Sequence, residues 1–231
     1  MKQYAWLFFC IILLSGCVPD INSDGFITIA FLGDSNTVER DYPGVAPELL
    51  LDNWPTYMTR DFAPPGWKVL NIAWIGHTVT NPAHALWQLH CAQQQLDFWQ
   101  CTSIIPQDPK HPAMDALIAA FGTNDLRTSS NEEIVAGYQQ LIAAAAPIKT
   151  FIATVPPYTG SDAALYDATA RVPQINQLIR FTFPAWQVID FDTGFTSEYF
   201  DYNDSPGDGV HLNKSGQILR ALRAWNVINK L

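Results

Sequence analysis

Short apolar runs alternate with longer helical patterns along the chain, and this alternation predicts the fold class. Five runs are short, rich in β-branched or aromatic residues and followed by turn residues, as buried strands are. Helical patterns are clearest at residues 131–146 and 215–229. Strands that alternate with helices pair in parallel, with helices on both faces, so we expect an α/β sandwich of three layers with about five mostly parallel strands. The five runs cover residues 26–32, 68–72, 113–121, 150–155 and 186–191.

Residues 131–146 give the strongest helix signal. A polar N-cap candidate opens the segment, Glu132 and Glu133 fall in the first turn, and the body is rich in alanine. Acidic side chains near a helix N-terminus are stabilised by the helix dipole, and alanine has the highest helix propensity. The segment therefore predicts a helix between the third and fourth strands.

Length and composition limit the class of protein. A chain of 231 residues suits one domain with a substantial core, and a composition of 48% apolar and 15% charged residues is that of a globular protein. The net charge of −9 argues against a nucleic-acid partner, which would need a basic surface to neutralise phosphates. We therefore expect a single globular domain over residues 26–231 and no nucleic-acid partner.

The first residues have the pattern of an export signal. A lysine at position 2 precedes an apolar run over residues 4–14, which is too short to span a bilayer comfortably but suits a signal peptide. The sequence Leu14-Ser15-Gly16-Cys17 resembles the lipobox of bacterial lipoproteins. That resemblance implies a signal peptide over residues 1–16, lipid on Cys17, a tether over residues 17–25 and attachment to a membrane of the cell envelope. An ordinary signal peptide cut nearby is the alternative.

The remaining cysteines are a candidate disulfide pair. Cys10 would leave with the signal and Cys17 would carry lipid, so Cys91 and Cys101 remain in a compartment that permits disulfides. Ten residues of continuous helix would separate them by about 15 Å, beyond the limit of about 7 Å between bridged Cα atoms. A bridge therefore requires the chain to break or reverse between them, and two buried free thiols are the alternative.

Candidate site residues follow the predicted strands closely. Ser35 comes after the first strand, Gly76 after the second and Asn124 after the third. In an open parallel sheet, ligands bind outside the carboxyl ends of the strands, so these residues should meet at one edge. His211 lies between the last strand and the final helix, in a loop that can return to that edge.

These residue types fit nucleophilic catalysis. A serine hydroxyl needs a base to accept its proton, and histidine titrates near neutrality. We therefore predict Ser35 as the nucleophile, His211 as the base and Asp208 as the group that orients the base. The oxyanion formed by attack on a carbonyl needs donors that are already in place, and the N–H groups of Ser35 and Gly76 and the Asn124 amide can supply them.

Four sequence blocks that carry these residues resemble those of the SGNH, or GDSL-type, hydrolases. Their order and spacing match over nearly the whole mature chain. The resemblance implies a flavodoxin-like fold, the Ser35, Asp208 and His211 triad, and an oxyanion hole built from Ser35, Gly76 and Asn124. The blocks are Gly33-Asp34-Ser35, Asn71 to Gly76, Gly122-Thr123-Asn124-Asp125 and Asp208-Gly209-Val210-His211-Leu212-Asn213.

Departures from the family pattern leave the predicted catalytic residues intact and leave the substrate open. Asn36 stands where the family often has Leu or Ile, which changes the wall beside the nucleophile, and His77 stands where Asp is common, near the substrate edge. Both are therefore candidate substrate-binding residues, together with Trp74. Residues 73–112 exceed what a short crossover helix needs, which predicts that this insertion shapes the acyl or alcohol pocket. The other histidines are not spaced like a helical metal-binding pair, so we expect neither a metal nor a cofactor.

The expected activity is serine-dependent hydrolysis of carboxylic esters at the cell envelope. Acetylated saccharides, short-chain esters and lysophospholipids all present a carbonyl to the same machinery, and the triad does not select among them. Two alternatives stay open: an acyltransferase that uses the same triad, and a noncatalytic binding protein of the envelope.

Overall fold

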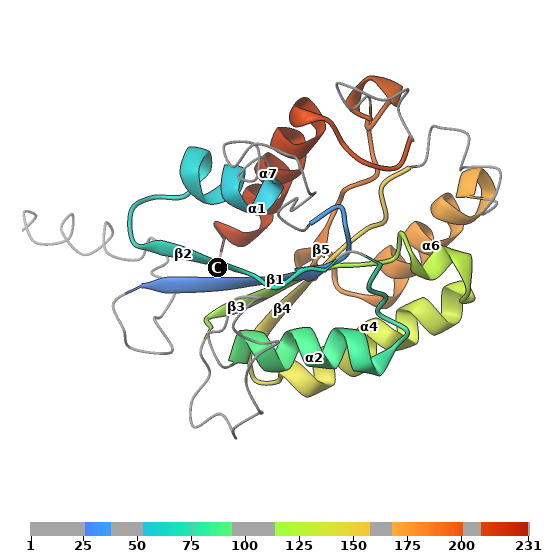
Figure 1. Cartoon of the computed structure of the whole chain (residues 1–231), viewed down its shortest axis with the longest axis horizontal. Coiled ribbons are helices and arrows are strands. Elements are labelled where there is room, and N and C mark those ends of the chain that lie inside the picture. The colour runs from blue at the N-terminus through green and yellow to red at the C-terminus, as the bar shows by residue number, and fades with distance from the viewer. Residues whose placement is uncertain are drawn as a thin grey trace, which may run out of the picture.

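A parallel five-stranded sheet forms the centre of the protein (Figure 1). The computed structural model describes residues 26–37, 53–74, 76–93, 114–157, 168–200 and 209–230. The strand order is β2-β1-β3-β4-β5, the order of flavodoxin-like doubly wound folds. The predicted α/β class and sheet are thus confirmed. The strands are β1 (Ile27–Gly33), β2 (Trp67–Asn71), β3 (Ala116–Ala120), β4 (Lys149–Ala153) and β5 (Val188–Ile189).

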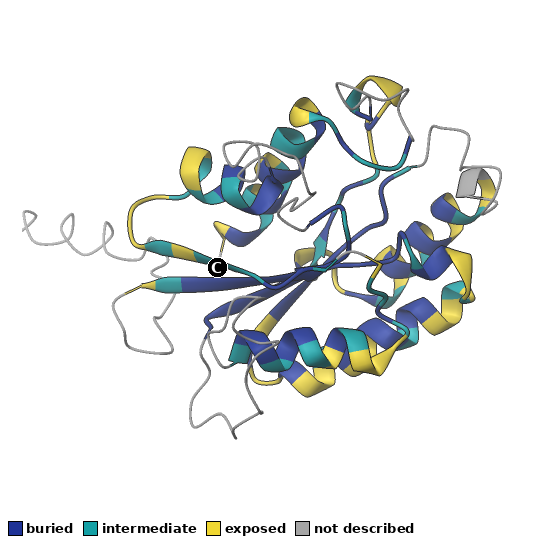
Figure 2. Ribbon diagram, in the orientation of Figure 1, coloured by how far each residue is buried: buried dark blue, intermediate teal, exposed yellow. Residues whose placement is uncertain are grey.

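Helices cover both faces of the sheet, which explains why its strands are apolar on both sides. In β1, Ala30 and Leu32 join the core cluster on one face, and Ile29 and Phe31 join the cluster on the other. All five residues of β3 are buried (Figure 2). One face carries α1 (Trp54–Tyr57) and α7 (Lys214–Ile228), and the other carries α2 (Pro82–Gln93), α4 (Asn131–Ala145) and α6 (Ala168–Thr182).

Side-chain caps set the starts of the two predicted helices. Ser130 and Glu133 form a capping box at the start of α4: the Glu133 N–H donates to the Ser130 hydroxyl at 3.2 Å, and the Ser130 N–H donates to the Glu133 carboxylate at 2.7 Å. Asn213 caps α7 by accepting the Gly216 N–H at 3.0 Å. The cap at Asn213 ends the preceding loop two residues after His211.

Other elements differ from the sequence expectations. The strand expected over 186–191 is reduced to Val188–Ile189, because residues 185–187 form a 3₁₀ turn that leaves Trp186 56% exposed. No helix was predicted over α6, which contains Pro173. The chain between β1 and β2 adds α1 and a π-helical segment over Met58–Phe62, neither of which was expected.

Several expectations concern residues at the edge of, or beyond, the described part. Cys91 is buried in α2 and is disulfide-bonded, whereas Cys101 lies outside the described residues. The signal peptide, Cys17 and the tether over residues 17–25 also lie outside them. In the part that the structure describes, no helix is long and apolar enough to cross a membrane.

Candidate active site

A tight turn at the end of β1 carries Ser35. The Thr37 N–H donates to the Asp34 carbonyl at 2.9 Å, and the Asn36 N–H donates to the Asp34 carboxylate at 2.9 Å. Asp34, Asn36 and Thr37 are buried, while Ser35 is partly exposed. The turn therefore ends the strand and presents the Ser35 hydroxyl at the carboxyl edge of the sheet.

His211 meets Ser35 across most of the length of the chain. Its Nε2 atom lies 2.9 Å from the Ser35 hydroxyl oxygen, which is hydrogen-bond distance. The loop that carries the histidine bends at Gly209, which has a φ of 67°. It ends at Asn213, the cap of α7. Asp208 lies outside the described residues, so its predicted contact with His211 stays a prediction.

The two other predicted oxyanion donors belong to neighbouring loops. The His77 N–H donates to the Trp74 carbonyl at 3.2 Å, and Gly76 has a φ of 77°, in the left-handed region that glycine adopts readily. The Asn124 side-chain amide donates to the His77 carbonyl at 3.2 Å. A primary amide has two N–H groups, so this bond leaves Asn124 a second donor for an oxyanion.

The Asp125 carboxylate links these two loops by hydrogen bonds. Its buried carboxylate accepts the N–H groups of Gly122 at 3.1 Å, Val79 at 3.1 Å and Thr80 at 2.9 Å. Burial raises the pKa of Asp125, and the backbone donors oppose that rise. The last residue of the Gly-Thr-Asn-Asp block thus fixes the loop after β2 against the loop after β3.

Gly122 allows the chain to pass close to β4. Its φ is 112°, and a Cβ atom at this position would lie 2.4 Å from Cγ2 of Val155. We expect Gly122→Ala to lower the unfolding free energy by roughly 2–5 kcal/mol, because backbone strain and steric overlap add. Gly66→Ala is the matched control: Gly66 has a φ of 98° and open space around it, so only backbone strain applies. Urea denaturation that gave equal losses for both variants would reject the steric part.

Two buried ionisable side chains, Asp34 and Arg220, lie close to the turn that carries the nucleophile. Arg220 of α7 is 1% exposed, donates from one terminal nitrogen to the Asn36 carbonyl at 3.2 Å, and lies over the Phe191 ring at 5.0 Å. Burial raises the pKa of Asp34 to about 6, while the Asn36 N–H and the Arg220 charge oppose that rise. Arg220 was not predicted as a residue near the site. Its one indication in the sequence is that it falls on the apolar side of α7, where Ala221 and Ala224 are buried.

The Asp34 carboxyl should make stability depend on pH. Its folded pKa of about 6 exceeds the ordinary value of 3.8, so the unfolded chain releases this proton first as the pH rises. The stabilisation of the folded state by protonated Asp34 is therefore fully present below about pH 4. It is lost as the pH rises through 6, which lowers the unfolding free energy by roughly 3 kcal/mol. Urea denaturation of wild type and Asp34→Asn from pH 4 to 8 measures it. The difference in unfolding free energy between them should change over this range, and a constant difference contradicts the assignment.

The predicted substrate-binding residues differ in exposure. Trp74 and His77 are partly exposed beside the oxyanion donors, whereas Asn36 is 3% exposed with its amide 3.5 Å from the Thr123 hydroxyl. Contact of these three side chains with substrate stays a prediction.

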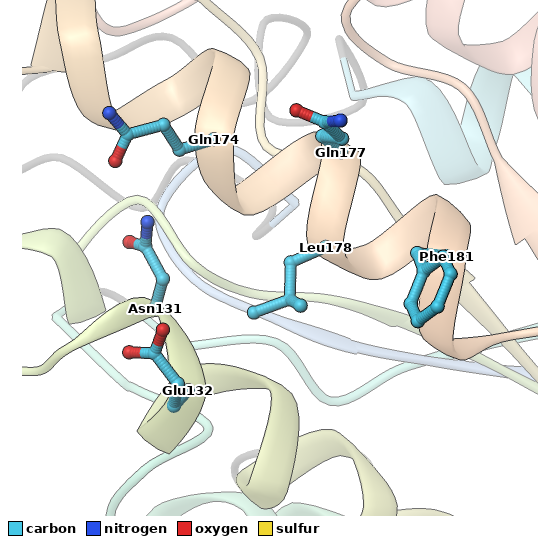
Figure 3. Close-up of a pocket in the computed structure, with 6 residues that line it drawn as sticks. All are labelled: Asn131, Glu132, Gln174, Gln177, Leu178 and Phe181. Carbon is cyan, nitrogen blue, oxygen red and sulfur yellow. The ribbon is translucent and has the colours of Figure 1, made fainter.

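A pocket elsewhere on the molecule is separate from this site. It lies between α4 and α6 (Figure 3). These helices cover the face of the sheet opposite α7, and the pocket shares no residue with the loops around Ser35. Phe181 beside it is 88% exposed. The pocket is therefore not the place where Ser35 would act. Its lining residues are Asn131, Glu132, Gln174, Gln177, Leu178 and Phe181.

Fold and site together define a class of protein. A serine hydroxyl in hydrogen-bond reach of a histidine, at the carboxyl edge of a flavodoxin-like sheet, is the arrangement of a serine hydrolase. Residues 31–219 match the GDSL-like lipase/acylhydrolase family. The chain belongs to this family and is a serine ester hydrolase.

Solved structures share the fold at low sequence identity. The lipase/acylhydrolase from Enterococcus faecalis is 19% identical with a TM-score of 0.60, and the match covers 88% of this chain and 96% of that one. The carbohydrate acetylesterase from Sinorhizobium meliloti is 17% identical with a TM-score of 0.54, over 87% and 98% of the two chains. The aryl esterase from M. smegmatis is 16% identical with a TM-score of 0.56, over 87% and 98%. A comparison with curated protein sequences finds no match.

Proposed function

We propose that the protein removes short acyl groups from esters, with O-acetylated saccharides as its substrates. The observation that carries the proposal is the 2.9 Å separation between the Ser35 hydroxyl and the His211 imidazole. That contact lets the base take the hydroxyl proton as the oxygen attacks a carbonyl carbon.

The chain's own groups supply each step of the proposed reaction. Ser35 attacks the ester carbonyl, and its proton passes to Nε2 of His211. The negative charge on the carbonyl oxygen is stabilised by the N–H groups of Ser35 and Gly76 and by the Asn124 amide. The C–O bond to the alcohol breaks as His211 returns the proton to the leaving oxygen. Water, deprotonated by His211, then releases the acid from the acyl enzyme, and Asp208 orients the imidazole throughout.

The packing beside the nucleophile favours a short acyl group. Asn36 and Thr123 are 3% and 4% exposed and contact one another, so this side of the site is filled by protein atoms. The partly exposed Trp74 ring offers an apolar face on which a sugar ring can stack. The similarity in fold to the carbohydrate acetylesterase from Sinorhizobium meliloti is in keeping with this substrate class.

A series of acyl chain lengths tests the substrate class. On p-nitrophenyl esters we expect kcat/KM for acetyl to exceed that for octanoyl by about tenfold or more, since a closed pocket rejects added methylenes. Acetate should also be released from an acetylated oligosaccharide. A kcat/KM that rises with chain length would point to lipid substrates instead. Transfer of acetyl to an added sugar in preference to water would identify an acyltransferase.

We also propose that the enzyme works at the cell envelope on a lipid anchor. The apolar run over residues 4–14 and the lipobox-like Leu14-Ser15-Gly16-Cys17 support this location. Mass spectrometry of the mature N-terminus from a bacterial host should find Cys17 as the first residue, carrying lipid. An unmodified N-terminus at another residue would contradict the anchor.

A further inference from the structure

A glutamine of α2 reaches across to the end of the strand that precedes the nucleophile. Gln88 is fully buried. Its side-chain oxygen accepts the Gly33 N–H at 2.9 Å, and its side-chain nitrogen donates to the Gly33 carbonyl at 2.9 Å. Because an amide oxygen only accepts and an amide nitrogen only donates, these two bonds fix which way the Gln88 amide points.

The fixed amide determines the state of His77. The Gln88 side-chain nitrogen lies 2.7 Å from Nδ1 of His77, and it can only donate, so Nδ1 must accept. The ring is therefore neutral and carries its proton on Nε2. Burial and the neighbouring His84 lower the pKa of His77 to about 4, in agreement with this assignment. The His77 ring also stacks on the His84 ring, with 4.3 Å between ring centroids, and meets the Trp87 ring edge to face, with 5.8 Å between centroids.

The main chain of His77 contacts both loops that contain the predicted oxyanion donors. Its carbonyl accepts the Asn124 amide at 3.2 Å, and its N–H closes the turn that contains Gly76. Trp74, at the start of that turn, donates its N–H to the Gly33 carbonyl at 3.1 Å, the same oxygen that Gln88 binds. One buried amide thus joins the strand ahead of Ser35 to the loop that contains Gly76, and the His77 carbonyl of that loop binds Asn124 of the next loop.

We propose that Gln88 and His77 are positioning residues of the oxyanion hole. Gln88 holds the His77 ring against the end of β1, and the His77 carbonyl orients the Asn124 amide toward the carbonyl oxygen of the substrate. The inference rests on the ester hydrolysis proposed above. It gives the His77 ring a structural partner and a role through Asn124, in place of the substrate contact expected from the sequence.

Two substitutions with matched controls test the proposal. His77→Phe keeps a ring for stacking but removes the acceptor for Gln88, and Gln88→Leu removes the whole link. We expect kcat for p-nitrophenyl acetate to fall roughly tenfold for His77→Phe and roughly 100-fold for Gln88→Leu, with KM within about twofold, because the donors act mainly on the transition state. The controls His90→Phe and Gln140→Leu, which make the same replacements away from the site, should leave both constants unchanged. Active enzyme is counted by labelling with a fluorophosphonate, so misfolded protein does not contribute.

Each outcome decides the proposal. Loss of kcat at constant KM in His77→Phe supports it, even where Gln88→Leu fails to fold. A lower melting temperature with wild-type kcat shows a purely structural link, and a raised KM with wild-type kcat shows a substrate contact, so either result overturns it. An active wild type with unchanged variants rejects this inference alone, whereas a wild type that hydrolyses no ester rejects the proposed function and this inference with it.

Discussion

Replacing Ser35 with alanine should lower kcat for p-nitrophenyl acetate by about 10⁴-fold or more while the protein stays folded. The hydroxyl oxygen lies 2.9 Å from Nε2 of His211, and without it no acyl enzyme can form. The side chain is partly exposed, so its removal leaves no buried cavity and the melting temperature should change little. Steady-state kinetics and thermal denaturation of the same preparation provide the two readings.

Ser215→Ala is the matched control for this substitution. Ser215 is exposed in the first turn of α7, four residues after His211, and should tolerate alanine with wild-type kcat. A Ser35→Ala enzyme that kept a tenth of the wild-type kcat would mean that another group is the nucleophile.

Replacing Asp125 with alanine should cost both stability and activity. Three backbone N–H groups, from Gly122, Val79 and Thr80, would lose their shared acceptor inside the protein. Each buried donor left unpaired costs about 1–3 kcal/mol, so we expect the unfolding free energy to fall by roughly 3 kcal/mol or more. The loops that carry the predicted oxyanion donors would also lose their common acceptor, so kcat should fall at least tenfold, the effect expected from a small misplacement of catalytic groups.

Two further variants make the Asp125 prediction specific. Asp125→Asn keeps one acceptor oxygen and should lie between wild type and Asp125→Ala in both measurements. Glu132→Ala removes an exposed carboxylate from the first turn of α4 and should change the unfolding free energy by less than about 1 kcal/mol. Urea denaturation that gave the same unfolding free energy for Asp125→Ala and Glu132→Ala would show that the three hydrogen bonds to Asp125 do not stabilise the fold.

The sheet could be read from the sequence because its signals are local. The first four predicted strands agree with β1 to β4 to within a few residues, since each is a compact apolar run closed by Gly, Pro or Asn. The helix predicted over 131–146 agrees with α4 for the same reason, with its cap one residue earlier, at Ser130. Parallel pairing then placed the motif residues at a single edge, where the structure brings Ser35 to His211.

Contacts between distant residues could not be read in this way. Gln88 is one polar residue in a helix of mixed composition, and only the folded chain shows that both polar atoms of its side chain bind Gly33. Nothing in the sequence around Arg220 shows that it is buried. Its burial close to Asp34 follows only from the packing of α7 on the sheet. The short β5 has a similar cause, because the turn at 185–187 takes up residues that the apolar pattern assigned to a strand.

The site motifs were predictable to different degrees. Ser35 and His211 were assigned from residue type and order; the structure brings the two side chains into contact, and their roles as nucleophile and base stay predictions. Asn124 was assigned as a donor, but its partner, the His77 carbonyl, depends on a loop geometry that no residue pattern encodes. Asp125 appeared as part of a motif, and its work as a three-fold acceptor is visible only in the structure.

Covalent labelling tests the central claim most directly. The protein is incubated with a fluorophosphonate, its intact mass is measured, and the modified peptide is identified by mass spectrometry. We expect one adduct per chain, located on Ser35. It should form far more slowly in His211→Ala, because the base that activates the hydroxyl is missing. An esterase-active protein that takes up no adduct, or that carries it on another serine, would contradict the assignment of Ser35 and His211 as nucleophile and base.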